Sequence, residues 1–591
     1  MKMPPGFFLF ICFGTVGIAQ ALQPDFGPNV TVFDPSMPAS TIQSALDAVS
    51  ETQVLPDSQF DTTRHAFLFK PGTYTVDTLV GYYTSVAGLG LSPDDVTING
   101  IINVEGTGGQ GEPGGQNGVY TDSADNNFWR SIENMHIVPQ TGQTERWAVS
   151  QACPIRRMHI GGTTLFWIMP LYGGFSSGGF IADSVIEDEV LSGSQQQWLT
   201  RNSVLDNGWT NGVWNMVFCG VTGAPAQGFP NPPYTTLAQS PVTREKPFLY
   251  VNARGDFNVF IPALQSNSSG VTWANGPAAG SSIPITDFYI AKPTDSAAAI
   301  NLALAFGKNL ILTPGIYNLD QPLHILWPNT VVLGLGYPTL VPTRGNTTME
   351  VANVPGVKLS GLLFDAGTIN SPVLLKVGRP ALLSILRGAG CDPNNPTLIQ
   401  DVFFRIGGAT PGQATISLEI NASNVIIDDV WAWRADHGNG VGWTSNTARH
   451  GLIVNGDDVT AYGLFVEHFQ NYEVLWNGEN GTTIFFQNEM PYDPPTQAAW
   501  SHNGIDGFAS YKVADWVRHH QGWGLGAYCY FDIHPSIIGA NGFEAPDTPG
   551  VQFHDILTVS LGGVGTIENV INNTGGTADA ANQVVDVVSY P

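Results

Sequence analysis

Short apolar runs separated by Gly, Asn and Asp turns make up much of the second half of the chain. The clearest lie at 357–367, 399–408, 424–438, 459–471 and 482–490. Their β-branched and aromatic residues and their turn boundaries predict buried strands, with little helical periodicity. Strands that recur at intervals of roughly 20 to 40 residues are typical of coils in a parallel β-helix with loops of varied length. Hairpin signals at the spacing of an antiparallel sandwich are scarce, which disfavours that fold.

The same pattern opens both halves of the chain. Residues 41–90 and 298–336 each predict a short helix, a strand, a Pro-Gly-x-Tyr turn, a second strand and a Gly-Leu-Gly segment. The Pro-Gly pairs supply a turn between two β runs. A long-range internal repeat of this kind indicates a duplicated unit.

These features resemble known families. Helix, strand, Pro-Gly-x-Tyr and Gly-Leu-Gly at the head of a β-helix resemble the pectate-lyase-like superfamily of secreted glycan-active proteins. Two such heads in one chain resemble the exo-β-1,3-glucanases of glycoside hydrolase family 55. The second half, at 327–336 and 488–495, is also similar to uncharacterised secreted proteins named for a coagulation-factor-5/8-type module, for which this chain has no room. The resemblance implies an all-β fold of two right-handed parallel β-helices in tandem, packed side by side. No catalytic motif matches residue by residue, so no family residue is carried over.

The chain divides into four predicted parts. Residues 1–21 have the charged start, the apolar run and the Ala-Gln-Ala end of a signal peptide. Residues 22–240 form the first predicted β-helix domain, and 241–290, rich in Ser, Asn and Gly, the connection. Residues 291–591 form the second β-helix domain, with the candidate active site. The leader predicts secretion to the extracellular space or the cell wall.

Charge narrows the choice of partners. The 591 residues contain 23 Lys and Arg against 49 Asp and Glu, a formal net charge of −26. Such a surface repels nucleic acid, anionic membranes and polyanionic glycans. We therefore expect a monomer that acts on a neutral polysaccharide substrate, without nucleic acid or membrane as partner and without a cofactor.

Four cysteines remain after the leader: Cys153, Cys219, Cys391 and Cys529. An even number in an oxidising compartment allows three pairings. We favour Cys153–Cys219 and Cys391–Cys529, because each bond then lies within one half of the chain. Buried free thiols are the alternative.

Six N-x-S/T sequons follow the leader. Sequons occur often by chance, but behind a signal peptide they predict N-glycosylation in a eukaryotic host. They lie at Asn29, Asn267, Asn346, Asn421, Asn480 and Asn572.

Polar residues at the strand ends predict a groove. Equivalent side chains on successive coils stack about 4.8 Å apart. Alignment of the strands places in or near one column Asp365, Arg405, Arg434, Glu467 and Gln487. One or two residues further on lie Asp436, His468 and Glu489. Carboxylates on neighbouring coils would lie about 5 to 10 Å apart, an interval that suits a pair of glycosidase carboxylates.

Three carboxylates are the catalytic candidates. Glu467 and Glu489 follow apolar triplets at strand ends, where partial burial raises a carboxyl pKa. Asp436, beside His437 and Arg434, is better placed to stay ionised. A glycosidase needs one protonated and one ionised carboxyl. We therefore predict Glu467 and Asp436 as the two leading catalytic candidates and Glu489 as the third. Turn capping or simple exposure is the alternative for each.

Arginines, histidines and aromatic residues are the binding candidates. Flat aromatic faces suit the apolar faces of sugar rings. The predicted substrate-binding residues are Arg405, Arg434, His437, His468, Trp443, Trp476 and Tyr492. If Arg434 faces the groove, strand alternation turns Trp431 and Trp433 inward as core.

Metal ligation is not expected from the sequence. The histidines show no zinc-ligand spacing. The aspartate pair 457–458 is predicted as the turn that enters a strand, and no fixed spacing supports a calcium site at this pair or at 428–429.

A secreted glycoside hydrolase that acts on a neutral polysaccharide, such as a β-1,3-glucan, is the leading hypothesis. It would use a two-carboxylate acid/base mechanism. A polysaccharide lyase is the enzymatic alternative, although basic residues are scarce. A non-catalytic glycan-binding or wall-associated protein is the third reading, because a β-helix does not dictate function.

Overall fold

The computed structural model describes residues 23–108, 122–166, 175–379 and 391–591. The predicted signal peptide, 1–21, lies outside these ranges. No helix within them has both the length and the apolar character needed to span a membrane. Almost all regular structure is β-strand, and the largest sheets are parallel, as the sequence predicts.

The first β-helix is built on a sheet whose main path has only parallel neighbours. In order it contains β1 (Val30–Phe33), β2 (His65–Phe69), β5 (Thr84–Gly88), β10 (Arg130–Val138), β12 (Ile155–Ile160), β14 (Phe180–Ala182), β17 (Gln197–Arg201), β20 (Asn215–Cys219) and β21 (Tyr234–Leu237). A second face contains β11 (Glu145–Arg146), β13 (Thr164–Leu165), β16 (Val190–Gly193) and β19 (Trp209–Asn211). The strands of both faces recur in the same chain order, so each circuit adds one coil.

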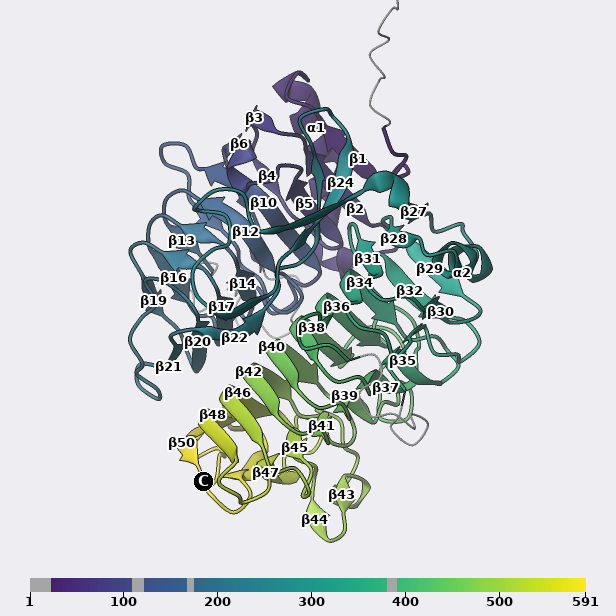
Figure 1. Cartoon of the computed structure of the whole chain (residues 1–591). Coiled ribbons are helices and arrows are strands. Elements are labelled where there is room, and N and C mark those ends of the chain that lie inside the picture. Colours follow the sequence, from purple (N-terminus) through teal and green to yellow (C-terminus); the bar gives the residue numbers. More distant parts are fainter. Residues whose placement is uncertain (1–22, 109–121, 167–174, 380–390) are drawn as a thin grey trace, which may run out of the picture.

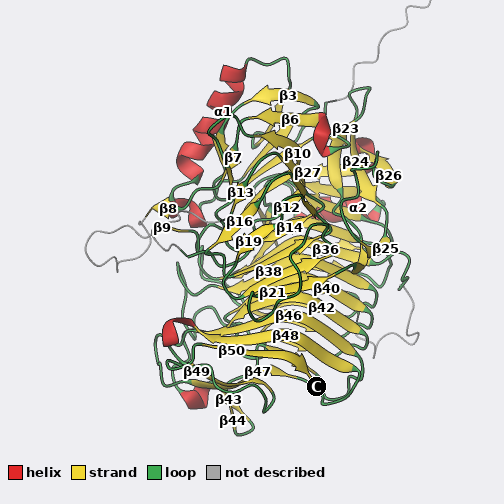
Figure 2. Cartoon of the chain, turned by 90° about the vertical axis from the view of Figure 1, so that its left-hand side faces the viewer, coloured by secondary structure: helices red, strands yellow, loops and turns green. Residues whose placement is uncertain are grey.

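The second β-helix is longer and more regular, and Figure 2 shows its strands as a ladder. Its first face contains β27 (Phe288–Ala291), β28 (Asn309–Leu312), β31 (Val331–Gly334), β34 (Lys358–Asp365), β36 (Thr397–Ile406), β38 (Val425–Arg434), β40 (Val459–Glu467), β42 (Gly481–Glu489), β46 (His520–Cys529), β48 (Val551–Ser560) and β50 (Val584–Tyr590). Its second face contains β30 (Leu323–Ile325), β33 (Met349–Val351), β35 (Ser371–Val377), β37 (Ala414–Ile420), β39 (His450–Val454), β41 (Val474–Trp476), β45 (Tyr511–Val513), β47 (Ile538–Glu544) and β49 (Thr566–Ile571). Only β50 runs antiparallel to its neighbour on the first face, where it closes the C-terminal end.

The two heads fold alike. Helix α1 (Ala39–Gln53) and helix α2 (Ala297–Ala305) each bury apolar residues against the first coils. In both turns the glycine has a positive φ, 148° at Gly72 and 152° at Gly315. A Cβ there would lie within 2.8 Å of a proline ring atom, of Pro35 in the first head and Pro293 in the second. The repeated Pro-Gly turn therefore reflects the same steric requirement in both copies.

Two small antiparallel sheets connect the β-helices. One pairs β22 (Ser240–Thr243) with β25 (Gln265–Ser268). The other joins β23 (Phe248–Val251), β24 (Phe257–Pro262) and β26 (Gly280–Pro284). The connection predicted at 241–290 is thus an ordered segment that packs on the first coils of both halves, through the core cluster that contains Leu249, Val259 and Ile311.

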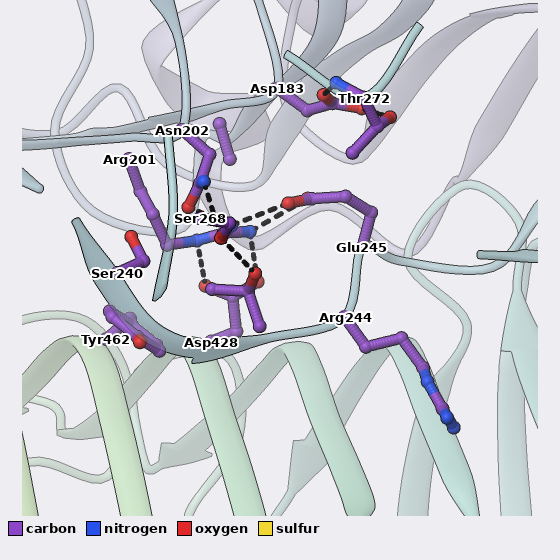
Figure 3. A network of polar contacts seen from close by, with 12 residues as sticks. Asp183, Arg201, Asn202, Ser240, Arg244, Glu245, Ser268, Thr272, Asp428 and Tyr462 are labelled. Atoms are coloured by element: carbon purple, nitrogen blue, oxygen red, sulfur yellow. Dashed lines mark hydrogen bonds and ion pairs between the residues drawn. The ribbon is translucent and has the colours of Figure 1, made fainter. Parts of the chain in front are cut away.

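The β-helices lie side by side (Figure 1) and share an apolar interface. Tryptophans 129, 431 and 433 lie within this third core, apart from the interior core of each β-helix. Buried ion pairs also cross the interface, between arginines of the first β-helix and aspartates of the second: Arg156 with Asp401 at 2.6 Å and with Asp428 at 2.9 Å, and Arg201 with Asp428 at 2.8 Å. Figure 3 shows Arg201 between Asp428 and Glu245. The Glu245 carboxyl lies 2.6 Å from Nη1 of Arg201.

The two aspartate pairs of the second β-helix lie in different settings. Asp457 and Asp458 lie in the bend before β40, as predicted. Asp428 and Asp429 instead lie within β38 and are buried. This position agrees with the strand predicted at 424–438. Arginines of the other β-helix neutralise Asp428 in the buried strand, which the local sequence does not show.

Candidate active site between the two β-helices

A pocket of about 170 Å³ opens at the interface, at the ends of β38, β40 and β42. Both β-helices line it. The second contributes Trp433, Asp436, His437, Glu467, His468, Glu489, Tyr492 and Leu561. The first contributes Asp125, Asn126, Phe128, Gln151, Ser177 and Gln196. The three predicted catalytic carboxylates are therefore brought together, but in a site that the second half does not form alone.

The strand register differs from the alignment drawn on the sequence. Direct neighbours across the coils are Arg405, Trp433, Glu467 and Glu489. Arg434 and Gln487, predicted in or near this column, lie beside it and not in it: Arg434 directly follows Trp433, and Gln487 precedes Glu489 by two residues. The strands from β34 to β48 on this face each contain one left-handed residue that the pairing skips, such as Asp429 with φ of 63° in β38 and Phe485 with φ of 68° in β42. Such bulges lie opposite one another on adjacent strands, so the register stays constant across them, but each resets the alternation of side chains along its strand.

The same bulge decides which way the tryptophans point. Val430 and Ala432 belong to the interior core of the second β-helix. Trp431 and Trp433 lie on the opposite, outer face, against the first β-helix. The prediction that the tryptophans face inward while Arg434 faces the groove is therefore wrong. Alternation separates the two sets of residues, but it does not tell which set is inside.

Glu467 is held on both oxygens by N–H donors. Gln151 Nε2 donates to one carboxyl oxygen at 2.7 Å, and Trp431 Nε1 donates to the other at 2.8 Å. Ser177 Oγ in turn donates to Gln151 Oε1 at 3.2 Å. Burial, together with the charge of Asp436, raises the pKa of Glu467 to about 8. Gln151 and Ser177 come from the first β-helix, and no local motif in the sequence identified them.

Glu489 lies beside Glu467 on the next coil. The hydroxyl of Tyr492 donates a hydrogen bond to its carboxyl group. Burial and the neighbouring Glu467 raise the pKa of Glu489 well above its usual range. Glu467 and Glu489 lie at paired positions on neighbouring strands, with no lysine or arginine among the described lining residues, and neighbouring carboxyls of this kind titrate together and hold one proton between them.

Asp436 remains ionised next to this pair. Gln59 Nε2 donates to His437 Nε2 at 2.5 Å, so the ring proton lies on Nδ1, which donates to Asp436 at 2.9 Å. Trp433 Nε1 donates to the same carboxyl group at 3.2 Å. Burial of Asp436 raises its pKa. The contact with His437 outweighs this effect, with a further contribution from His468, and holds the pKa of Asp436 below its usual range. The carboxyl is a fixed negative charge at the pocket wall.

His468 and Tyr492, both predicted for substrate binding, line the pocket in contact with each other. Their rings lie 4.4 Å apart, edge to face. His468 Nδ1 donates to the carbonyl oxygen of Met490 at 3.2 Å, and burial lowers the pKa of this histidine. His468 is therefore a neutral imidazole whose Nε2 faces Asp436 at 3.9 Å.

Four other predicted binding residues do not line the pocket. Arg405 is buried in an ion pair with Asp365 at 2.6 Å. Arg434 is buried too, with Asp493 at 2.8 Å. Trp443 packs against the apolar cluster around Met490 and Trp500. Trp476 is fully buried in the interior core. The two arginines are not available for substrate because they form ion pairs with buried carboxylates. The two tryptophans are not available because they pack in apolar clusters.

The cysteines and sequon asparagines are not among the residues that line this pocket. All four predicted disulfide cysteines, Cys153, Cys219, Cys391 and Cys529, are free, so the predicted pairing is wrong. Cys153 packs in the interior core of the first β-helix, whereas Cys219 belongs to the interface core. The six sequon asparagines are all at least partly exposed, and their glycosylation remains a prediction.

Known proteins resemble this chain over nearly its whole length. Residues 288–489 match the family described as the LAM55 pectate lyase-like domain. An exo-β-1,3-glucanase of Streptomyces sp. (strain SirexAA-E / ActE) is 51% identical over 570 residues, which cover 96% of this chain and 90% of that protein. The structure of sacteLam55A from Streptomyces sp. SirexAA-E superposes with a TM-score of 0.89, covering 96% of this chain and 99% of the other at 51% identity.

A glutamate-to-alanine variant of that protein in complex with glucose gives a TM-score of 0.90 at 50% identity, covering 97% of this chain and all of the other. The two-headed β-helix and the identity of half the residues agree with each other. The chain belongs to glycoside hydrolase family 55.

Proposed function

We propose that the protein is an exo-acting glycoside hydrolase that cleaves β-1,3-glucan in the pocket between its two β-helices. The carrying observation is the pair of buried Glu467 and partly buried Glu489 in a chain 51% identical to an exo-β-1,3-glucanase. The glucose complex of the variant relative supports a site for a neutral hexose. Secretion and a monomeric state are carried forward as parts of the same proposal.

Glu489 is the proposed general acid. Between the two glutamates, Glu467 accepts two N–H donors, which stabilise its anion, while Glu489 accepts only the hydroxyl of Tyr492. The shared proton therefore belongs on Glu489. Delivered to the glycosidic oxygen, it lets the sugar leave as a neutral alcohol rather than as an alkoxide.

Glu467 is the proposed base. Its carboxylate keeps lone pairs directed at the pocket, and Gln151 and Ser177 beside it offer polar partners for a water molecule. That water attacks the anomeric carbon and gives its proton to Glu467, so the two carboxyls exchange protonation states over one cycle. The fixed charge of Asp436 stabilises the positive charge that develops on the sugar ring.

The lining charges favour a neutral glycan over a uronate. Asp125, Asp436, Glu467 and Glu489 line the pocket, and its described lining includes no lysine or arginine. A lyase needs cations to neutralise the uronate carboxylate, and Arg405 and Arg434 are committed to Asp365 and Asp493. The aromatic rings of Phe128, Trp433 and Tyr492 instead supply faces for a sugar ring.

Sugar release from a panel of glycans tests the function. We expect glucose from β-1,3-glucan, with little release from β-1,4-glucan and no unsaturated product from polygalacturonate. Glu467→Gln and Glu489→Gln are each expected to reduce the rate by about 10²–10⁴-fold. Glu479→Gln, in a loop that is not part of the pocket lining, is the matched control. Equal rates in the wild type and both pocket variants would refute the proposal.

A further inference from the structure

A second cluster of chemically active side chains lies on the first β-helix, outside the active-site pocket. It consists of Asp94, His136 and His159. Asp94 lies in the short 3-10 helix Pro93–Asp95, directly before β6 (Val96–Asn99). His136 on β10 pairs with Thr97 on one side and with His159 on the other. Three successive coils therefore bring these residues together from segments 65 positions apart.

The geometry suits a small cation. The two imidazole rings stack with centroids 4.0 Å apart and planes 10° apart. Asp94 Oδ1 lies 2.7 Å from His159 Nδ1 and 3.9 Å from His136 Nδ1. The three ligand atoms lie within 4.8 Å of one another. Ligand atoms on one tetrahedral zinc ion are separated by about 3.3 Å, given metal–ligand distances of about 2.0–2.2 Å. The side chain of Asp94 is 52% exposed, so it can rotate to close the set.

The hydrogen-bond partners of His159 also favour a metal ligand at this position. A neutral imidazole has one N–H and one lone pair. His159 faces a carboxylate at each nitrogen, Asp94 at Nδ1 and Glu187 at Nε2, the latter at 3.0 Å. If Nε2–H donates to Glu187, the Nδ1 lone pair opposes an oxygen of Asp94.

We propose that Asp94, His136 and His159 bind a divalent transition-metal ion such as Zn²⁺. Two imidazoles and one carboxylate form a three-ligand set typical of zinc, whereas Ca²⁺ and Mg²⁺ prefer oxygen ligands alone. Glu187 accepts the remaining N–H of His159, an arrangement that orients a metal-binding histidine and increases its basicity. Water completes the coordination on the exposed side.

The bound ion would link successive coils. Asp94 precedes β6, and the two histidines lie on the next two strands of the same ladder, with Glu187 directly after β15 (Val185–Ile186). One ion thus holds the turn before β6 to β10 and β12. None of the four residues lines the active-site pocket, so the proposed role is structural stabilisation.

Calorimetric titration of the full-length protein, first dialysed against a chelator, tests the site. We expect one Zn²⁺ per chain and no comparable binding of Ca²⁺. His159→Ala is expected to weaken Zn²⁺ binding at least 100-fold, and Glu187→Gln by about 10–100-fold. His324→Ala is the matched control, because His324 also lies beside a carboxylate, Glu350 at 3.7 Å, but does not belong to the cluster.

Two further measurements separate binding from folding. Zn²⁺ is expected to slow hydrogen exchange of backbone amides at 93–99 in the wild type but not in His159→Ala, with glucan hydrolysis unchanged in both. Should His159→Ala not fold, Asp94→Asn tests the same ligand set at an exposed position. The absence of Zn²⁺ binding by the wild type would overturn the proposal, leaving an ion-paired imidazolium only. Equal Zn²⁺ affinity in the wild type and the cluster variants would overturn it as well.

Discussion

Two polar regions lie along the same interface, and their carboxylates have different kinds of partner. Near the middle of β36 and β38, Asp401 and Asp428 meet Arg156 and Arg201 in ion pairs of 2.6 to 2.9 Å. At the ends of β38, β40 and β42, carboxylates meet amides, histidines and indole N–H groups instead. Strand β38 contributes to both regions, through Asp428 and through Trp433.

The consequences for protonation follow from the partners. Although burial opposes it, Arg156 and Lys246 hold the pKa of Asp401 below its usual range. Burial raises the pKa of Glu467 to about 8, since its neighbours are uncharged or negative. A buried charge with a counter-charge stays ionised and makes each partner costly to remove, while an unpaired one keeps a proton available for chemistry. The interface therefore separates a structural region from a catalytic one within a few residues of one strand.

The largest expected effect is a loss of activity that differs between variants of Glu467 and Glu489. Glu489→Gln is expected to reduce glucan hydrolysis by about 10²–10⁴-fold. The same variant should retain much of its rate on an aryl glucoside with a good leaving group, because such a group departs without protonation. Glu467→Gln should lose activity on both substrates, since water activation is needed for each. Steady-state kinetics of the two variants on the two substrates measures this difference. Identical loss patterns would contradict the assigned roles.

Removal of a charge from the paired region should give the opposite outcome. Asp428→Asn leaves Arg156 and Arg201 without part of their counter-charge, which we expect to destabilise the fold by about 3–5 kcal/mol. Thermal unfolding would show a lowered midpoint, while the rate constant of the folded fraction should change little. Asp457→Asn, in the exposed bend before β40, is the control and should change stability by less than about 0.5 kcal/mol. An unchanged midpoint in Asp428→Asn would mean that the ion pairs do not hold the interface.

The fold was largely predictable, and the reason lies in repetition. Apolar strands and the two Pro-Gly turns at Gly72 and Gly315 are local features, and each copy supports the other. The facing of side chains within each strand was not predictable, because left-handed residues such as Asp429 and Phe485, which reset the alternation, leave no clear signature in the sequence. The alignment of Arg405 with Arg434 was displaced by one residue, since Arg405 pairs with Trp433.

The site was predictable only on one side. Glu467, Glu489 and Asp436 follow strands of one β-helix, so their proximity follows from coil stacking. Gln151 and Ser177 reach the pocket from the other β-helix, and their contact with Glu467 depends on how the two halves pack. Arg405 and Arg434 were misassigned for the converse reason, because their buried carboxylate partners make them structural.

A smaller expected effect is the pH dependence of stability that the unpaired carboxyls of the pocket cause. The pKa of Glu467 is raised from 4.5 to about 8 in the folded protein. Glu467 and Glu489 titrate as a pair, so the folded state binds their shared proton more tightly than the unfolded chain does. The resulting contribution to stability is complete below pH 4.5 and is lost as pH rises toward 8. Over this window the slope for one group is at most about 1.4 kcal/mol per pH unit. Glu467→Gln should flatten the decline in the thermal midpoint, whereas a parallel decline in the wild type and the variant would count against the raised pKa.

The smallest expected effect concerns the residue that joins the two regions. Trp433 Nε1 donates to Asp436 at 3.2 Å, and its ring stacks on Phe60 of the first β-helix with centroids 6.3 Å apart. Trp433→Phe keeps an aromatic ring at the interface but removes this donor, at a cost of about 1–3 kcal/mol for a buried acceptor left with fewer partners. Because Asp436 keeps its hydrogen bond with His437, we expect the lower end, about a fivefold loss in kcat/KM with a small change in thermal midpoint. A large loss of stability with full activity would place Trp433 with the structural region and not with the pocket.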